Sequence, residues 1–168
     1  MIYHKLVKHI KIVLHNIYFN TFCAANIFPE TLRANLYKWG GVKIGTNVRI
    51  CSHCFKGGDL LSIGNGCFIN YNVFFDGKIT IKDNCNIAYN VTFVNSNHEI
   101  GDAQRRAGKN YFTEIEVGSG TWIGANCVIL PNVKIGDGVI IGAGSVVTKD
   151  CESNAIYAGN PAKLIRRL

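Results

Sequence analysis

One histidine and the polar segment around it are the first residues of this sequence whose types could do chemistry. His98 is the only histidine beyond His53, and it lies in a polar stretch, residues 95–114. Imidazole titrates near neutral pH, so His98 could act as a general base that takes the proton from an attacking hydroxyl. The alternative is a surface histidine that hydrogen-bonds nearby backbone, and the residues alone do not decide between the two.

A second candidate is the sequence CSHC, in which Cys51 and Cys54 have the spacing of a metal or redox pair. Structural zinc sites use four ligands, and neither a second CxxC nor a nearby histidine pair completes such a set. We therefore expect no metal at these cysteines.

A six-residue repeat defines the elements that must position His98. Its third place holds Ile, Val or Phe, and the residue two places earlier is usually small or β-branched. The third-place residues are Ile44, Ile50, Ile63, Ile69, Phe75, Ile81, Ile87, Phe93, Val117, Ile123, Ile129, Ile135, Ile141 and Val147. Two inward residues separated by one outward residue make a short strand, and Gly and Asn elsewhere permit tight bends. The repeat predicts an all-β solenoid of short stacked strands.

The repeat is interrupted over residues 51–61 and over about 95–114. A long polar loop that leaves a regular solenoid commonly carries function, so the second interruption is a candidate functional segment. The same frame places Cys67, Cys85 and Cys127 in the small inward place. We therefore interpret most of the seven cysteines as core residues and not as a disulfide framework.

Before the repeat, residues 1–22 carry apolar side chains at helical spacing, with the basic residues mostly off that stripe. The stripe comprises Tyr3, Leu6, Val7, Ile10, Val13, Leu14, Ile17 and Tyr18, and the basic residues are His4, Lys5, Lys8, His9, Lys11 and His15. A second short helix is predicted over about 31–39, between Pro29 and Gly40. The first helix packs its stripe on the solenoid end or a neighbouring subunit, which we favour, or lies on an anionic membrane.

Composition excludes some classes of protein. The chain has 168 residues, of which 48% are hydrophobic and 17% charged, so it is not a disordered chain. It lacks a run of 18 apolar residues, and lysines interrupt the apolar residues at the start, so we expect neither a membrane span nor a signal peptide. We expect a reduced, cytoplasmic protein, at the inner face of the membrane if the arm binds lipid. The net charge of +7 implies an anionic partner: nucleic acid, a membrane surface or a phosphorylated cofactor.

Three motifs carry a resemblance to a known family: FVNSNHEI, TWIGANCVILPNVKIGDGVIIGAGSVVTKD and AGNPAKLIRR. From about residue 40 onward the chain resembles the hexapeptide-repeat acyltransferases, which include galactoside, maltose, nodulation-factor, capsular-polysaccharide and xenobiotic acetyltransferases. The resemblance implies a left-handed parallel β-helix, usually a homotrimer with acetyl-CoA bound between subunits. It divides the chain into a helical arm (1–40), a solenoid domain with a protruding loop (41–150) and a tail (151–168).

The resemblance also implies roles for single residues. His98 occupies the place of the family's catalytic histidine, which implies a general base for direct transfer without an acyl-enzyme. The residues that match the family's acetyl-CoA contacts are Trp122, Ala125, Ala143, Thr148, Lys149, Lys163 and Arg166. The galactoside enzyme has Arg where Lys163 stands, which leaves a bidentate phosphate contact in doubt there.

The acceptor contacts follow from the segment FINYNVFFDG, which resembles the sugar-binding stretch of the galactoside enzyme. By position, Asn70 would hydrogen-bond the acceptor and Asp76 would assist, although Asn70 could equally be a turn residue of the coil. Arg105 and Arg106 could contact an anionic acceptor, but we favour solvated side chains.

These observations predict an acetyl-CoA-dependent O-acetyltransferase that acts on a saccharide, such as a capsular or lipopolysaccharide unit. The main alternative is N-acetylation of an amino sugar or acetylation of a streptogramin-type antibiotic. A γ-type carbonic anhydrase would need three metal-binding histidines, and His98 is alone in its half of the chain. A scaffold without activity would not need His98 or the basic tail, and no nucleic-acid motif is present.

Overall fold

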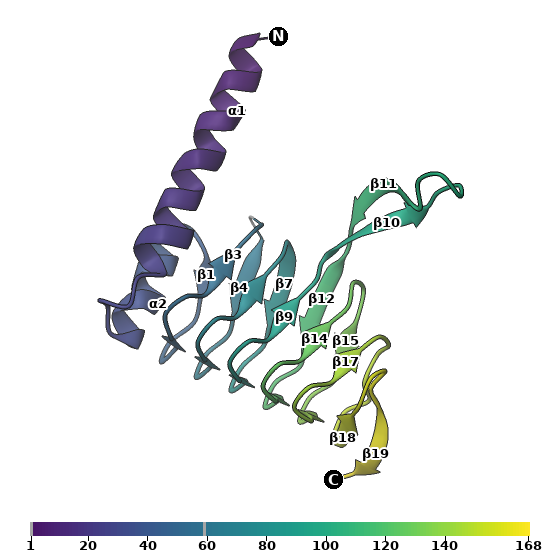
Figure 1. Ribbon diagram of the computed structural model, residues 1–168. Helices are drawn as coiled ribbons and strands as arrows, with labels where there is room; N and C mark the ends of the chain where they lie inside the picture. Colours follow the sequence, from purple (N-terminus) through teal and green to yellow (C-terminus); the bar gives the residue numbers. More distant parts are fainter. Residues whose placement is uncertain (1, 59) are drawn as a thin grey trace.

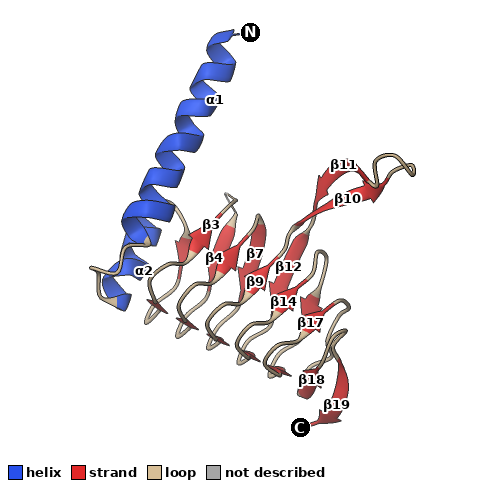
Figure 2. Ribbon diagram, in the orientation of Figure 1, coloured by secondary structure: helices blue, strands red, loops and turns tan. Residues whose placement is uncertain are grey.

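The computed structural model describes residues 2–58 and 60–168, without the side chains of residues 2–5 and 8. Over this range the chain forms a helical arm and a parallel β-solenoid from which a hairpin protrudes (Figures 1 and 2). The stripe residue Tyr3 and the basic residues His4, Lys5 and Lys8 thus have side chains outside the described part.

Parallel strands stacked from coil to coil build three faces of the solenoid within the described residues. Face 1 comprises β1 (Lys43–Ile44), β4 (Leu61–Ile63), β7 (Lys78–Ile81), β12 (Glu114–Val117) and β15 (Lys134–Ile135). Face 2 comprises β2 (Arg49–Ile50), β5 (Phe68–Ile69), β8 (Asn86–Ile87), β13 (Trp122–Ile123), β16 (Ile140–Ile141), β18 (Ala155–Ala158) and the antiparallel β19 (Lys163–Arg167). Face 3 comprises β3 (Phe55–Lys56), β6 (Phe74–Phe75), β9 (Thr92–Phe93), β14 (Val128–Ile129) and β17 (Val146–Val147). We name each bend by the faces it joins: the 1/2, 2/3 and 3/1 corners.

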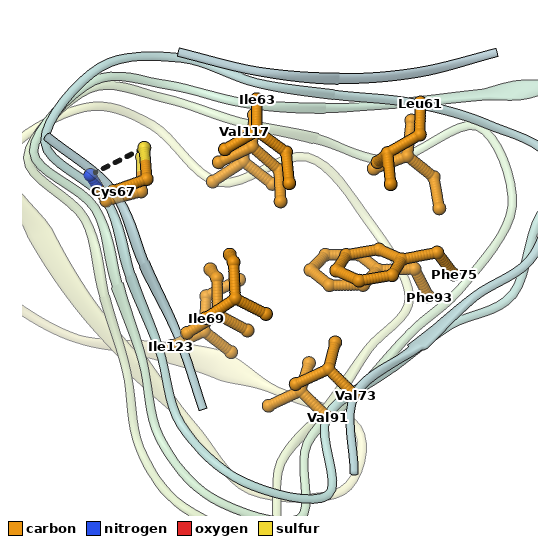
Figure 3. Close-up of a cluster of buried hydrophobic side chains, with 14 of the residues drawn as sticks. Leu61, Ile63, Cys67, Ile69, Val73, Phe75, Val91, Phe93, Val117 and Ile123 are labelled. Carbon is orange, nitrogen blue, oxygen red and sulfur yellow. Dashed lines mark hydrogen bonds between the residues drawn. The ribbon is translucent and has the colours of Figure 1, made fainter. Parts of the chain in front are cut away.

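The third-place residues form columns in the interior, as the repeat predicts. Ile63 pairs with Ile81, which lies 18 residues later, so one coil contains three repeats. Looking along the solenoid, Figure 3 shows the inward residues of successive coils in register. The rings of Phe75 and Phe93 stack with centroids 5.6 Å apart. Each such buried side chain contributes about 1.5–3 kcal/mol, and the columns hold the corners in place.

Asparagine residues form the tight bends at one corner of the solenoid. Asn72, Asn90 and Asn126 share the 2/3 corner, and each has a positive φ near 60°. Their side chains form a ladder, with Nδ2···Oδ1 distances of 2.9 and 3.0 Å between successive coils. Asparagine tolerates this left-handed conformation better than most residues, which explains its recurrence in the repeat.

The predicted interruption over residues 51–61 is wrong for the part of it that the structure describes. The coil continues there through β3, and Ile44 pairs with Ile63, 19 residues later, so the insertion is a single residue. Lys56 occupies the inward place and is only 3% exposed. Its Nζ lies 4.6 Å from the centroid of the Phe19 ring. A lysine in a place otherwise held by Ile, Val or Phe made the coil look interrupted.

The second interruption is a hairpin. β10 (Ser96–Ile100) and β11 (Ala107–Phe112) pair antiparallel and project from the 3/1 corner, between β9 and β12 (Figure 1). The segment predicted as a loop therefore has its own backbone hydrogen bonds, which give it a defined direction.

The arm begins with α1 (Ile2–His15), continues in a π-helical segment η1 (Asn16–Cys23) and ends in α2 (Glu30–Trp39). The second predicted helix is thus confirmed to within one residue. Arg33 of α2 is 1% exposed. Its guanidinium donates at 2.8–2.9 Å to the backbone carbonyls of Cys23, Ala25, Phe28 and Ile50. Arg33 thereby joins η1, the loop before α2 and the first coil.

The apolar stripe of α1 does not pack on the solenoid end. Leu6, Ile10, Val13, Leu14 and Ile17 are 49–60% exposed, which corrects that half of the favoured interpretation. Packing on a neighbouring subunit remains a prediction. Among the described residues, the structure contains no helix that is both long enough and apolar enough to cross a membrane.

Candidate functional site

His98 lies on β10 of the hairpin, with its side chain exposed. Its Nδ1 is 2.9 Å from the carbonyl oxygen of Gly108 on β11. A carbonyl oxygen only accepts hydrogen bonds, so Nδ1 must carry the proton in this contact. The neutral ring then has its lone pair on Nε2, as a general base requires.

The base of the hairpin is held by Asp76, which directly follows the face 3 strand β6. Its Oδ2 accepts hydrogen bonds from the backbone N–H of Ser96 at 3.2 Å and from Ser96 Oγ at 2.7 Å. Ser96 lies two residues before His98 on the same strand, so the two side chains share one side of β10. Asp76 therefore lies where it can fix the direction of His98.

Asn95 anchors the hairpin, which the sequence did not reveal. It is 1% exposed, and its Nδ2 donates to the carbonyl of Thr113, where the hairpin rejoins the solenoid, and to that of Lys78 on the neighbouring strand β7. The available signal was position: Asn95 and Ser96 directly follow the last regular coil before the polar segment. Their polar side chains mark the transition from solenoid to hairpin.

Asn70 lies at a different corner of the solenoid from the hairpin. It follows β5 at the 2/3 corner, whereas the hairpin leaves the 3/1 corner. Its Oδ1 accepts a hydrogen bond from the Tyr71 N–H at 2.8 Å, as a turn residue does. It also lines a shallow cleft of about 320 Å³ with Phe68, Ala88 and Trp122. Within one chain, Asp76 is brought to the hairpin and Asn70 is not.

The residues that match acetyl-CoA contacts lie in three places, of which face 2 and the 3/1 corner hold the larger side chains. Trp122 on β13 is 54% exposed, and Lys163 and Arg166 are exposed on β19 of the same face. Thr148 and Lys149 follow β17 at the 3/1 corner. A single chain therefore presents face 2 and the 3/1 corner as separate surfaces.

Ala125 and Ala143 are neighbours at the 2/3 corner. The Gly144 N–H donates to the Ala125 carbonyl at 2.8 Å. A Cβ on Gly124 would lie 2.6 Å from the Ala143 nitrogen, so the corner has no room for a larger residue there. The result is a corner built of small, closely stacked residues.

The side chains at the 2/3 corner change from large to small along the solenoid. The strand registers align Tyr71 and Tyr89 with Ala125 and Ala143. Both tyrosines are about half exposed. Sequence reasoning missed these tyrosines, because only the stacking of coils shows that they continue the alanine column. The corner offers aromatic rings beside Asn70 and small side chains beyond them.

Cys51 and Cys54 do not form a reactive pair. Burial raises the pKa of Cys51 to about 11 and that of Cys54 to about 12, so both thiols are protonated at neutral pH. In residues 2–58 and 60–168, no group of three or more His, Cys, Asp or Glu side chains is arranged to hold a metal.

Comparison with known proteins finds the same six-residue repeat and related acetyltransferases. The family model of the bacterial transferase hexapeptide (six repeats) matches residues 114–149. Galactoside O-acetyltransferase of Escherichia coli K12 is 40% identical over 116 residues, which cover 68% of this chain and 57% of that enzyme. The acetyltransferase-like protein YJL218W of Saccharomyces cerevisiae is 35% identical over 168 residues, covering 98% of this chain and 83% of that protein. The chain thus spans little more than half the length of the Escherichia coli enzyme.

Solved structures show the same architecture. A galactoside acetyltransferase in complex with coenzyme A superposes with a TM-score of 0.74 at 30% identity, over 94% of this chain and 80% of that one. The N-acyltransferase AntD from Bacillus cereus, in complex with dTDP and 3-hydroxybutyryl-CoA, has a TM-score of 0.67 at 27% identity, over 76% and 73% of the chains. This chain belongs to the hexapeptide-repeat acetyltransferase family.

Proposed function

We propose that the protein transfers an acetyl group from acetyl-CoA to a hydroxyl of a saccharide, with His98 as general base. The observation that carries the proposal is the Nδ1–H···O=C contact between His98 and Gly108, which leaves Nε2 to accept a proton. Acetyl-CoA supplies a thioester, which is already activated for acyl transfer. The names of the galactoside and maltose enzymes among the similar proteins support a saccharide acceptor.

His98 carries a proton from the acceptor to the leaving group in this mechanism. Its Nε2 takes the proton from the acceptor hydroxyl as the oxygen attacks, and the imidazolium returns that proton to the leaving thiolate. Because the base acts on the acceptor, no acyl-enzyme forms. The Gly108 carbonyl accepts the Nδ1–H bond and so holds the ring with Nε2 free to act.

Binding of coenzyme A is assigned to the corner of Ala125 and Ala143, with Trp122 beside it. Lys163, Arg166 and Lys149 would face phosphate groups, and Thr148 lies next to Lys149. Asn70 and His98 lie at different corners of one chain, so a site that uses both needs a second copy. A homotrimer meets this need, and face 3 carries an apolar surface in which Phe55 and Phe74 stack at 4.7 Å.

The test is release of free thiol from acetyl-CoA with a panel of sugars, nucleotide-linked amino sugars and a streptogramin. Turnover with a neutral saccharide, lost in His98→Ala, supports the proposal. The similarity to AntD favours a second candidate, N-acylation of an amino sugar, so the panel includes matched hydroxyl and amino sugars. Turnover with the amino sugar alone would replace O-acetylation by N-acylation.

A further inference from the structure

The apolar stripe of α1 faces away from the molecule. Leu6, Ile10, Val13 and Leu14 of α1, with Ile17 at the start of η1, recur at spacings of three and four residues, which places them on one side of the arm. All five are at least 49% exposed. An apolar stripe this long on one helix is unusual on a surface in contact with water.

The C-terminal end of the opposite side contacts the solenoid, whereas Ile12 further along that side is also 49% exposed. His15 Nε2 lies 3.2 Å from the carbonyl oxygen of Lys56. Asn20 holds the same backbone, since its Oδ1 accepts the Lys56 N–H at 2.8 Å and its Nδ2 donates to the Lys56 carbonyl at 3.2 Å. Lys11 and Asn16 border a cleft of about 700 Å³ between this side of the helix and the first coil. These contacts fix the rotation of the helix about its own axis. The stripe therefore points away from the solenoid.

The charge of the arm indicates what covers the stripe. Residues 1–29 contain three lysines and three histidines but no Asp or Glu. The first acidic residue, Glu30, is 3.5 Å from Arg49 and is therefore already engaged. A second copy of the arm would bring like charges together, whereas anionic lipid headgroups complement both the charge and the stripe.

We propose that α1 is an amphipathic helix that binds the surface of an anionic bilayer. Its 14 residues correspond to about 21 Å of helix, long enough to lie in the interface plane. Five apolar side chains enter the boundary between headgroups and acyl chains, and the basic residues stay at headgroup level.

This surface lies on the same side of the solenoid as the hairpin. The arm contacts the chain at Lys56, where β3 meets the 3/1 corner, and the hairpin leaves the same corner two coils later. Figure 1 shows α1 and the β10–β11 hairpin projecting toward the same side. A bilayer bound by α1 therefore keeps His98 on the side of the solenoid that carries the membrane contact.

The experiment is flotation of the full chain with vesicles of phosphatidylcholine, alone or with 30 mol% phosphatidylglycerol. We expect the protein to float with the anionic vesicles only, and the bound fraction to fall when NaCl is raised from 50 to 500 mM. The variant Ile10→Asp/Leu14→Asp should lower the bound fraction at least tenfold. The control Ile27→Asp/Leu60→Asp adds the same charge at two exposed residues outside α1 and should float like the wild type.

Three results would overturn the proposal. The first is failure of the wild type to float with anionic vesicles, and the second is equal flotation of the stripe variant. The third is a change in the lipid-free oligomeric mass of the stripe variant by light scattering, since the stripe would then cover a second copy. Thermal melts and thiol release with a soluble acceptor should match the wild type in both variants, which keeps this test independent of the proposed acetyl transfer.

Discussion

Two segments are attached to the solenoid, the helical arm at its first coil and the β10–β11 hairpin at the 3/1 corner, and they are held in different ways. The arm is joined through buried groups: Arg33 binds four carbonyls, and the Tyr37 hydroxyl donates to the Cys54 carbonyl at 3.1 Å. The hairpin is joined by fewer polar contacts at its base, from the buried Asn95 side chain and from Asp76 to Ser96. Attachments of the arm should therefore matter for folding, and those of the hairpin for the position of His98.

The largest effect is expected at the hairpin. In His98→Asn the amide can still donate to the Gly108 carbonyl, so the hairpin should persist while the base is lost. We expect kcat to fall by about 10²–10⁴, which is ~3–5 kcal/mol in the barrier. Steady-state thiol release measures it, and an unchanged thermal melt shows that the hairpin is intact. Near-normal turnover would remove His98 from the mechanism.

A change in the arm should lower the free energy of unfolding. Arg33→Met leaves up to four buried carbonyls without their donor, at about 1–3 kcal/mol for each group that finds no replacement. We expect the free energy of unfolding in urea to fall by at least ~3 kcal/mol. The control is Arg49→Met, because Arg49 is exposed and its contact with Glu30 is worth at most about 1 kcal/mol. Equal losses in the two variants would contradict a special role for the buried guanidinium.

A smaller effect on the rate is expected from the base of the hairpin. Asp76→Asn replaces one accepting oxygen by an NH2 group, so Ser96 and the strand before His98 lose part of their anchor. We expect kcat to fall about tenfold, or ~1.4 kcal/mol, with little change in the acceptor KM. If Asp76 instead binds the acceptor directly, the KM rises. Asp83→Asn is a matched control, since Asp83 accepts the Asn65 N–H at 2.6 Å at a corner away from the hairpin.

How far the sequence could predict these features depends on the kind of residue. The inward columns were predictable because burial selects Ile, Val and Phe at a fixed spacing. Lys56 was not, because a buried lysine depends on partners such as Phe19 that lie far away in the sequence. The stripe of α1 was predictable as a helix face, but periodicity does not say whether that face turns inward. His98 was found from its type and motif, whereas its Gly108 partner required the hairpin pairing.

The smallest effect is expected where the arm meets the core. Lys56 is as buried as its aliphatic neighbours, and the register of β3 with β6 pairs it with Phe75 in the next coil. Its ammonium donates to the Gly58 carbonyl and lies over the Phe19 ring. Methionine keeps the volume of the stem and a favourable contact with the ring, and it removes the cost of burying a charge. We therefore expect Lys56→Met to change the free energy of unfolding by no more than ~1 kcal/mol.

Lys56→Ala removes both the aliphatic stem and the charge and leaves a cavity under the arm. Compared with Lys56→Met, which removes the charge alone, it therefore measures the contribution of the stem. Its unfolding free energy should fall by about 2 kcal/mol or more, as for other truncations of long buried side chains. Urea titrations of both variants, read beside Arg33→Met, rank the attachments of the arm. A Met variant as unstable as Arg33→Met would show that the ammonium, and not the packed stem, joins the arm to the first coil. The expected order, Arg33→Met then Lys56→Ala then Lys56→Met, follows because four carbonyls depend on the guanidinium and packing dominates at Lys56.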